Sequence, residues 1–401
     1  MLLKDKVFVP GVTKIPLNVP TYGRAEIDEA IDSLESGWVT MGAKVNRFEK
    51  MWAEYIGVQH AVMTNSGSSA NLLALSCLGL KPGDEVITPA LTWATTVFPI
   101  AQVGAVPVLV DVDLDTYNIN IDAVEKAITS RTKAIMPVHL LGNPCHLWNI
   151  MQLAAIHDLR VVEDACEAHG ATLNGHKMGQ WGDLGTFSFF FSHHITGIEG
   201  GIVCTSNDHF AELCRSMRAF GWIRESAERE SIAESHPDID PRFLFTNVGF
   251  NFRPTEIQGA LLIHQLPKLE GFIAHRRWLA NYWNQNLEEY SDFLILPYER
   301  PGTRHVRFAY PFLIRGDAPF TRRVFQQYLE SRGIESRQIE AGDMSIQPAM
   351  KHINHRISGS LENSNYIHHN GFFIGCHQGI GQAEADYVLE CCREFFEGIK
   401  R

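Results

Sequence analysis

The chain has 401 residues, of which 45% are hydrophobic and 20% charged, and its formal net charge is −11 at pH 7. This composition is typical of a soluble globular protein, and the length favours two domains over a single core. The negative charge balance argues against a nucleic-acid surface, residues 1–20 lack the apolar core of a signal peptide, and no apolar run approaches the ~20 residues that cross a bilayer. We therefore expect a cytoplasmic protein without nucleic-acid or membrane partners.

Short apolar segments alternate with amphipathic ones through the first two-thirds of the chain. Segments of four or five residues rich in Val and Ile predict strands at 61–64, 85–88, 106–110, 134–138, 160–163, 186–190 and 201–205. Helices are predicted between them at 69–78, 121–128 and 147–157. The alternation predicts an α/β fold, with a large and mainly parallel sheet covered on both faces, over residues 1–265.

The last third of the chain has a different pattern. A long helical region over 257–290 is interrupted by Pro267, which must kink it or start a new helix. Beyond it, a strand is predicted at 306–314 and helices at 322–332 and 383–396. We expect a smaller C-terminal α+β domain at 266–401, joined to the first by the kinked helix.

The cysteines are scattered along the chain and none forms a C-x-x-C pair. They are Cys77, Cys145, Cys166, Cys204, Cys214, Cys376, Cys391 and Cys392. Most lie in apolar surroundings, so we expect buried reduced thiols and no metal site.

The most informative stretch is Ser188-Phe-Phe-Phe-Ser-His193-His194-Ile-Thr-Gly-Ile-Glu199-Gly-Gly201. It resembles the cofactor-anchoring strand of the pyridoxal-phosphate-dependent sugar-nucleotide aminotransferases of fold type I (DegT/StrS type). That family has Ser-Phe-x-x-x-Lys followed by Gly-Glu/Asp-Gly-Gly, and here the lysine position is His193. The exchange is typical of the histidine-bearing 3-dehydratase branch. It implies that pyridoxal or pyridoxamine phosphate is bound without a covalent link.

The resemblance implies a role for several other residues. Gly67 and Ser68, at a predicted strand-to-helix turn, and Ser188 would hold the cofactor phosphate, although a Gly-Ser turn is also an ordinary helix cap. Asp164, in the frame Glu-Asp-Ala-x-x-Ala-x-Gly, would hold the pyridine nitrogen protonated, or else cap a loop.

Two further positions would line the cofactor ring. Trp93 falls where the family stacks an aromatic residue on the ring, although a tryptophan is often simply core. Glu167 stands where aminotransferases have glutamine or histidine near the ring oxygen, so its acid departs from their pattern.

The run Gly249-Phe-Asn251-Phe-Arg253 resembles the family's Gly-Tyr-Asn-x-Arg segment. The resemblance implies that Asn251 reaches the cofactor phosphate of a neighbouring subunit, and therefore a homodimer. Arg253 is a candidate for binding the carboxylate of a glutamate donor, because a guanidinium suits that anion. Alternatively, the run is a turn before a helix near Thr255 and Arg253 ties that helix to the sheet.

The resemblance implies a lyase of deoxysugar and lipopolysaccharide biosynthesis. It would remove the C3 hydroxyl of a nucleotide-linked 4-keto-6-deoxyhexose, first GDP-4-keto-6-deoxy-D-mannose, and be recharged by L-glutamate. His193, with an ordinary imidazole pKa near ~6.5, would be its acid and base. An iron–sulfur cluster is not expected, because residues 219–247 contain no cysteine.

Several alternatives stay open. The protein could be a sugar aminotransferase that makes a 4-amino sugar, a CDP-sugar 3-dehydrase, or a non-catalytic sugar-binding relative. The register could be shifted by one, so that His194 is the active histidine, or Lys177 could carry the cofactor.

Overall fold

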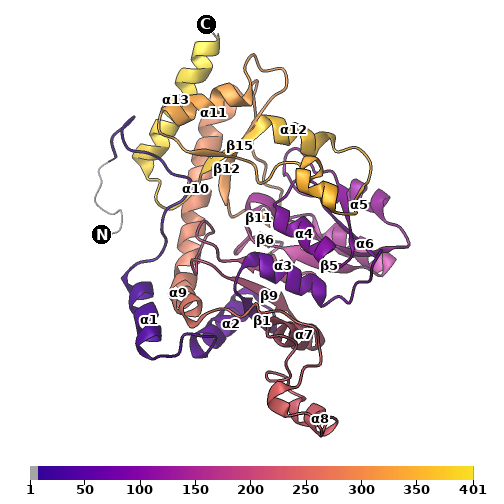
Figure 1. The fold of residues 1–401 in the computed structure, drawn as a ribbon. Coiled ribbons are helices and arrows are strands. Elements are labelled where there is room, and N and C mark those ends of the chain that lie inside the picture. The colour runs from indigo at the N-terminus through magenta and orange to yellow at the C-terminus, as the bar shows by residue number, and fades with distance from the viewer. Residues whose placement is uncertain (1–7, 401) are drawn as a thin grey trace.

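The computed structural model describes residues 8–400, and its centre is a sheet of eight strands in the order β1-β9-β8-β5-β4-β2-β3-β14 (Figure 1). Their bounds are β1 His60–Thr64, β2 Glu85–Pro89, β3 Val106–Val110, β4 Thr132–Ile135, β5 Arg160–Asp164, β8 Leu184–Ser188, β9 Gly201–Thr205 and β14 Arg356–Ile357. Only β9 runs antiparallel to its neighbours, so the prediction of a mainly parallel sheet is confirmed.

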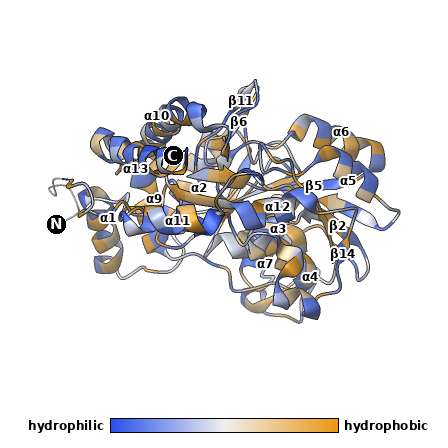
Figure 2. Ribbon diagram, turned by 90° about the horizontal axis from the view of Figure 1, so that it is seen from above, coloured by the Kyte–Doolittle hydropathy of each residue, from blue (hydrophilic) through white to orange (hydrophobic). Residues whose placement is uncertain are grey.

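Helices cover both faces of this sheet. They include α2 Ala43–Ile56, α3 Gly67–Ser76, α4 Ala94–Gln102, α5 Ile121–Ala127, α6 Leu147–His157 and α7 Asp208–Arg218. Side chains of β8 alternate between the two faces: Phe187 packs with Phe48 and Trp52 of α2, whereas Leu184 packs with Leu73 of α3 and Phe210 of α7. Both sides of the strands are therefore buried, and the covering helices have mixed apolar and polar residues (Figure 2).

Pro267 interrupts the long helical region as predicted. Helix α9 (Glu256–Gln265) ends in a 3-10 turn, Leu266–Lys268, before α10 (Leu269–Leu287) begins. Proline has no backbone N–H to continue the α-helical hydrogen bonds. The two helices run from the large sheet to the second sheet (Figure 1).

The second sheet is antiparallel, with the strand order β10-β12-β15-β13. Its strands are β10 Leu294–Ile295, β12 Ala309–Ile314, β13 Ser336–Gln338 and β15 Gly371–Gly375. Helices α11 (Arg322–Ser331) and α13 (Gln382–Lys400) pack on it through a core that contains Phe312, Phe325 and Phe396. This is the smaller α+β unit that the pattern predicts.

The remaining elements are short or peripheral. They are α1 Arg24–Glu35, α8 Arg229–Glu234, α12 Glu362–Asn370, the three-stranded sheet of β6 Thr172–Leu173, β7 His176–Lys177 and β11 Thr303–Arg304, and the 3-10 turns Leu140–Gly142, Pro241–Phe243, Glu288–Tyr290, Met344–Ile346 and Pro348–His352. Helix α8 projects from the body of the molecule (Figure 1). No helix in the described part of the chain is both long and apolar enough to cross a membrane.

Two segments pack with the unit on the other side of the predicted boundary between residues 265 and 266. Ile15 pairs with Ile334 and lies in the core of the smaller sheet. In the other direction, β14 extends the large sheet beside β3, and Arg356 Nη2 donates to the buried carboxylate of Glu85 at 2.9 Å. The division at this boundary stays a prediction.

Candidate functional site

A cavity of about 480 Å³ opens where the parallel strands end. Such crevices at the carboxyl ends of strands are the usual binding sites of open α/β sheets. Seven of the nine predicted site residues line it, namely Gly67, Ser68, Trp93, Asp164, Glu167, Ser188 and His193. Asn251 and Arg253 do not.

Asp164 is the last residue of β5 and is almost fully buried. Its Oδ2 accepts hydrogen bonds from Asn71 Nδ2 at 2.9 Å and Thr96 Oγ1 at 2.8 Å. Its Oδ1 accepts from the backbone N–H of Cys166 at 3.2 Å, so the expected loop contact also exists. These donors fix a carboxylate against one wall of the cavity.

The turn between β1 and α3 offers a place for an anion. Ser66 is the N-cap of α3, since its Oγ accepts from the backbone N–H of Ser69 at 3.1 Å. The helix is therefore capped by Ser66, which leaves the exposed Ser68 on the cavity wall. A Cβ on Gly67 would lie 2.4 Å from that of Ser188, so only glycine lets these two segments meet. Free N–H groups at a helix N-terminus suit a phosphate.

His193 lies on the cavity wall, next to the ring of Phe308 at a centroid distance of 5.3 Å. Its Nδ1 is buried and has no hydrogen-bond partner among the described residues. Burial, together with the charge of Arg276, lowers the pKa of His193 to about 3. The pKa is therefore lower than the expected ordinary imidazole value, because burial removes much of the water that would solvate the charged form. This favours the neutral imidazole, which has one ring N–H and one free ring nitrogen.

The two alternatives to His193 do not reach the cavity. His194 is fully buried, and its Nε2 lies 3.0 Å from the carbonyl oxygen of Val306, to which it donates. Lys177 lies in β7, with its ammonium group over the ring of Tyr55 at 4.6 Å. Neither residue lines the cavity, whereas His193 does.

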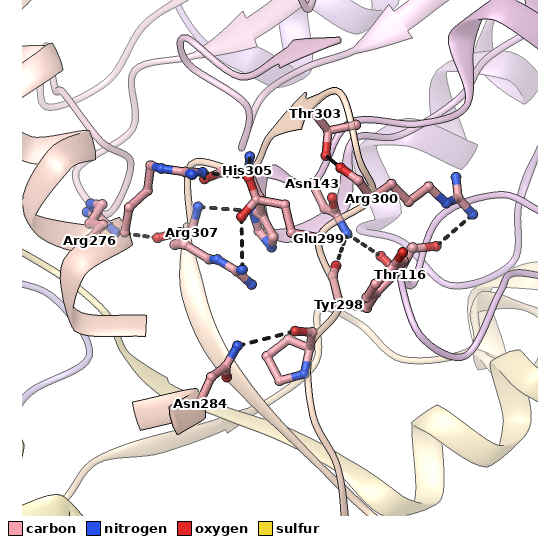
Figure 3. A network of polar contacts seen from close by, with 12 residues as sticks. Thr116, Asn143, Arg276, Asn284, Tyr298, Glu299, Arg300, Thr303, His305 and Arg307 are labelled. Carbon is pink, nitrogen blue, oxygen red and sulfur yellow. Dashed lines mark hydrogen bonds and ion pairs between the residues drawn. The ribbon is translucent and has the colours of Figure 1, made fainter. Parts of the chain in front are cut away.

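A network of buried polar contacts joins Arg276, Arg307 and Glu299 (Figure 3). Arg276 Nη1 donates to the carbonyl oxygens of Phe308 at 2.8 Å and Arg307 at 3.3 Å. Arg307 Nη2 donates to Glu299 Oε2 at 3.2 Å. The network holds the peptide that carries Phe308 in place against His193, and its positive charge favours a neutral imidazole.

Glu167 faces a second carboxyl group that the motifs do not reveal. Its Oε2 accepts from the backbone N–H of Leu141 at 2.6 Å, and Glu340 lines the same cavity. Burial and the nearby charge of Glu340 raise the pKa of Glu167 well above the usual range of a glutamic acid. The environment of Glu167 thus favours the protonated form of its carboxyl group.

Residues of the smaller sheet complete the cavity and were missed by sequence reasoning. They are Phe308, Arg337, Glu340 and Phe373. Arg337 is the only lysine or arginine on the cavity wall as far as the structure describes it, and its guanidinium lies 5.8 Å from the ring centroid of Trp93. No motif marks these positions, since tertiary packing alone brings them to the large sheet.

Asn251 and Arg253 lie outside the cavity, and Asn251 contacts Asn65 in the turn between β1 and α3. The carbonyl oxygen of Asn251 accepts from Asn65 Nδ2 at 3.4 Å. Its side chain accepts from Arg253 Nε at 3.1 Å, and the Arg253 guanidinium covers the ring of Phe220. Within one chain neither residue touches the cavity wall, so their predicted roles stay predictions.

The cysteines follow the expected pattern in seven cases. Those seven are buried and all eight are free. Cys166 is only half-buried because it lies on the cavity wall, where burial and the charge of Asp164 raise its thiol pKa.

Known proteins share this architecture over almost the whole chain. The family model of the DegT/DnrJ/EryC1/StrS aminotransferases matches residues 20–393. The GDP-4-keto-6-deoxy-D-mannose 3-dehydratase of Yersinia pseudotuberculosis is 38% identical over 379 residues, which are 91% of this chain and 95% of that protein. The dTDP-4-dehydro-2,6-dideoxy-D-glucose 3-dehydratase of Saccharopolyspora spinosa is 37% identical over 415 residues, 98% of this chain and 88% of that protein.

A solved structure extends the similarity to the fold. The crystal structure of GDP-4-keto-6-deoxymannose-3-dehydratase with a trapped PLP–glutamate geminal diamine has a TM-score of 0.89 to this chain at 35% identity, covering 94% of this chain and 99% of that one. The family model and these relatives cover almost the whole chain. This chain belongs to the DegT/DnrJ/EryC1/StrS aminotransferase family.

Proposed function

We propose that this chain uses pyridoxamine phosphate to remove the C3 hydroxyl of a nucleotide-linked 4-keto-6-deoxyhexose. The observation that supports the proposal is His193 on the cavity wall, because the sequence resemblance assigns this residue to the family's lysine position. Among the residues described, no lysine lines the cavity. The cofactor would therefore be held by non-covalent contacts alone.

The residues present fit that cofactor. The carboxylate of Asp164 would hold the pyridine nitrogen protonated, and the turn at Gly67 and Ser68 with the Ser188 hydroxyl would hold the phosphate. Trp93 would pack on a face of the ring. When bound, the group supplies an electron sink next to the sugar carbons.

His193 moves the proton in this scheme. Its neutral imidazole takes a proton and, once charged, returns it to the departing hydroxyl. Because burial disfavours the imidazolium, His193 gives the proton up readily. The products are a 3-deoxy-4-keto sugar and ammonia, and L-glutamate restores the amino group by leaving as 2-oxoglutarate.

The first substrate to try is GDP-4-keto-6-deoxy-D-mannose. A dehydratase named for it is 38% identical to this chain, and a solved relative contains a PLP–glutamate adduct. The relative that acts on a dTDP-linked sugar is almost as similar in sequence. The choice of GDP as the nucleotide therefore needs its own test. Such substrates belong to the cytoplasm, where we place the enzyme.

The active unit in this proposal is a homodimer. Asn251 lies outside its own chain's cavity, beside Asn65, and large apolar side chains are exposed near it, among them Phe243, Phe245 and Val248. A second copy of the chain would cover these groups and let Asn251 reach the partner's phosphate site. Arg253 would then lie near the donor carboxylate.

The test is product analysis with the purified protein, glutamate and pyridoxamine phosphate. GDP-, CDP- and dTDP-linked 4-keto-6-deoxyhexoses are supplied in turn, and sugar and ammonia are measured by mass spectrometry and an ammonia assay. Dehydration yields a sugar without the C3 oxygen and releases ammonia. A sugar that keeps that oxygen and gains nitrogen would identify an aminotransferase instead.

A further inference from the structure

Three histidine rings lie next to one another, and only one of them, His193, lines the cavity. The ring of His169 is in edge-to-face contact with those of His193 and His194, at centroid distances of 5.8 and 5.4 Å and interplanar angles of 75° and 73°. In the closer pair the two Nδ1 atoms are hydrogen-bonded at 3.3 Å. The His169–His193 pair thus has the same T-shaped arrangement, with centroids only 0.4 Å further apart.

Burial favours the neutral form of all three rings, in which each ring has one N–H and one lone pair. It lowers the pKa of His193 to about 3 and the pKa values of His169 and His194 well below the ordinary imidazole value. The carbonyl oxygens of Ser188 and Val306 act in the opposite direction on His169 and His194, and burial outweighs them.

The carbonyl oxygen of Val306 fixes where the protons of this group lie. A carbonyl can only accept, so the proton of His194 is on Nε2, 3.0 Å away, and its Nδ1 is a lone pair. The hydrogen bond between the two Nδ1 atoms then needs the proton of His169 on Nδ1. If His169 donated from Nε2 to Ser188 instead, two acceptors would face each other at 3.3 Å with no proton between them. Nε2 of His169 is therefore a buried acceptor, and it has no partner among the described residues.

Nδ1 of His193 is also buried and unpartnered, although the side chain as a whole is only half-buried. Its Nε2 is not enclosed in this way and makes no hydrogen bond to the described residues, so Nε2 is the nitrogen on the cavity side. Buried polar atoms without a partner are rare in folded proteins. A hydrogen bond from Nδ1–H of His193 to Nε2 of His169 would satisfy both atoms at once.

Aromatic side chains hold the ring of His169 in place. It is stacked against Phe187 and Phe189, with interplanar angles of 24° and 20°, and is in edge contact with Trp52. The indole N–H of Trp52 is a competing donor, because it too is buried and unpartnered. Of the two donors, only His193 lines the cavity.

We propose that His169 is a positioning residue for His193. Its Nε2 accepts a hydrogen bond from Nδ1–H of His193, so Nε2 of His193 presents a free lone pair to the bound ligand. The hydrogen bond at one ring nitrogen decides which tautomer a histidine adopts. His194 and Val306 fix the direction of this chain of hydrogen bonds. The inference rests on the proposed function for the reaction that the lone pair serves.

The first test needs no sugar and no change at His169. Nitrogen-15 NMR of the purified protein with labelled histidine distinguishes the two tautomers of each ring at neutral pH, and single substitutions identify the signals by their loss. His193 and His169 should be protonated on Nδ1, and His194 on Nε2. A proton on Nε2 of His193 or of His169 would overturn the proposal.

The second test removes the acceptor. His169→Phe keeps an aromatic ring against Phe187 and Phe189 but has no nitrogen. His193 should then lose its preference for Nδ1–H, and kcat for the sugar should fall about 10–100-fold with little change in KM or in the affinity for pyridoxal phosphate. His169→Gln, whose amide oxygen can accept the same hydrogen bond, should restore part of both. A His169→Phe protein in which the tautomer of His193 is unchanged has lost a structural contact only, and this result would overturn the proposal.

Two controls complete the comparison. His209→Phe makes the same exchange at an exposed position in α7, and Trp52→Phe removes the competing donor. Both should keep His193 protonated on Nδ1. A tautomer that changes in Trp52→Phe and not in His169→Phe would show that the inferred hydrogen bond does not form.

The tautomer measurements also stand apart from the proposed reaction. If none of the nucleotide sugars were turned over, the proposed function would fail, and NMR would still decide whether His169 positions His193. Circular dichroism of each variant checks that it is folded.

Discussion

The cavity has two walls that differ in origin. One is made by the ends of β5 and β8 and the turn before α3, which present Asp164, Ser188 and Gly67. The other is made by the antiparallel sheet, which presents Arg337 and Glu340. The first wall presents a carboxylate, a hydroxyl and a glycine turn, and the second presents a guanidinium and a carboxyl group that no motif marks. Under the proposed function, the first wall would bind the cofactor and the second would face the sugar.

The largest effect is expected on the first wall, from His193→Asn. The amide cannot take up the proton, so dehydration should fall by about 10²–10⁴-fold while cofactor binding survives. Steady-state ammonia release and the absorbance of bound pyridoxal phosphate measure the two quantities. Lys177→Ala is the control and should stay active, because Lys177 lies over Tyr55 away from the cavity. An inactive Lys177→Ala that binds no cofactor would contradict the assignment.

Asp164→Asn should have the next effect. Removing the carboxylate leaves the pyridine nitrogen without its counter-ion, so both the glutamate and sugar half-reactions should slow by about 10²–10³-fold. Stopped-flow absorbance follows each half-reaction separately. Loss of the sugar half-reaction alone would show that Asp164 serves the sugar and not the ring.

Arg337→Ala tests the second wall. A guanidinium that binds an anionic substrate through charged hydrogen bonds contributes about 1.5–3 kcal/mol, so KM for the nucleotide sugar should rise about 10–100-fold. Affinity for pyridoxamine phosphate should hardly change, which sharpens the distinction between the walls. Arg337→Lys should recover part of the loss. An equal loss of cofactor affinity would remove that distinction.

The smallest effect is on stability. The raised pKa of Glu167 means that the folded protein binds a proton more tightly than the unfolded chain. The resulting stability is fully present below the ordinary glutamic acid pKa and is lost as pH rises through the raised one. Thermal unfolding of the cofactor-free protein should therefore show a Tm that falls over this window, and Glu167→Gln should flatten the dependence by about 2–4 °C. An identical pH profile in the variant would mean that the pKa of Glu167 is not raised in the folded protein.

The first wall could be predicted from sequence and the second could not. Helix α6 and strand β9 begin and end at the predicted residues, because their apolar periodicity is regular and their ends are marked. Strand β8 was placed two residues late, since the sequence stays apolar from Phe189 to Phe191 after the strand ends at Ser188. Asp164 ends β5 and His193 follows β8, both in recognisable motifs, so we expected them to line one site.

Glu340 had no such signal. It lies in a turn after the three-residue strand β13, and its contact with Glu167 depends on how the two sheets pack. The two-residue strand β14 was not predicted for a similar reason, because its partner β3 lies far away in the sequence. The burial that lowers the pKa of His193 is also a tertiary property.

Strand β14 has a consequence for how the protein is made. During synthesis β3 emerges long before residues 356–357, and until then the backbone N–H and C=O groups on its outer edge have no partner. An open strand edge of this kind is a template for association with other chains. The buried Glu85 pairs with two arginines, Arg131 and Arg356. Before Arg356 has been synthesised, the largely exposed Arg131 is the only one of the two that can pair with it. A fragment that stops after α10 should therefore aggregate, and a nascent chain should need protection by chaperones until its C-terminal third has left the ribosome.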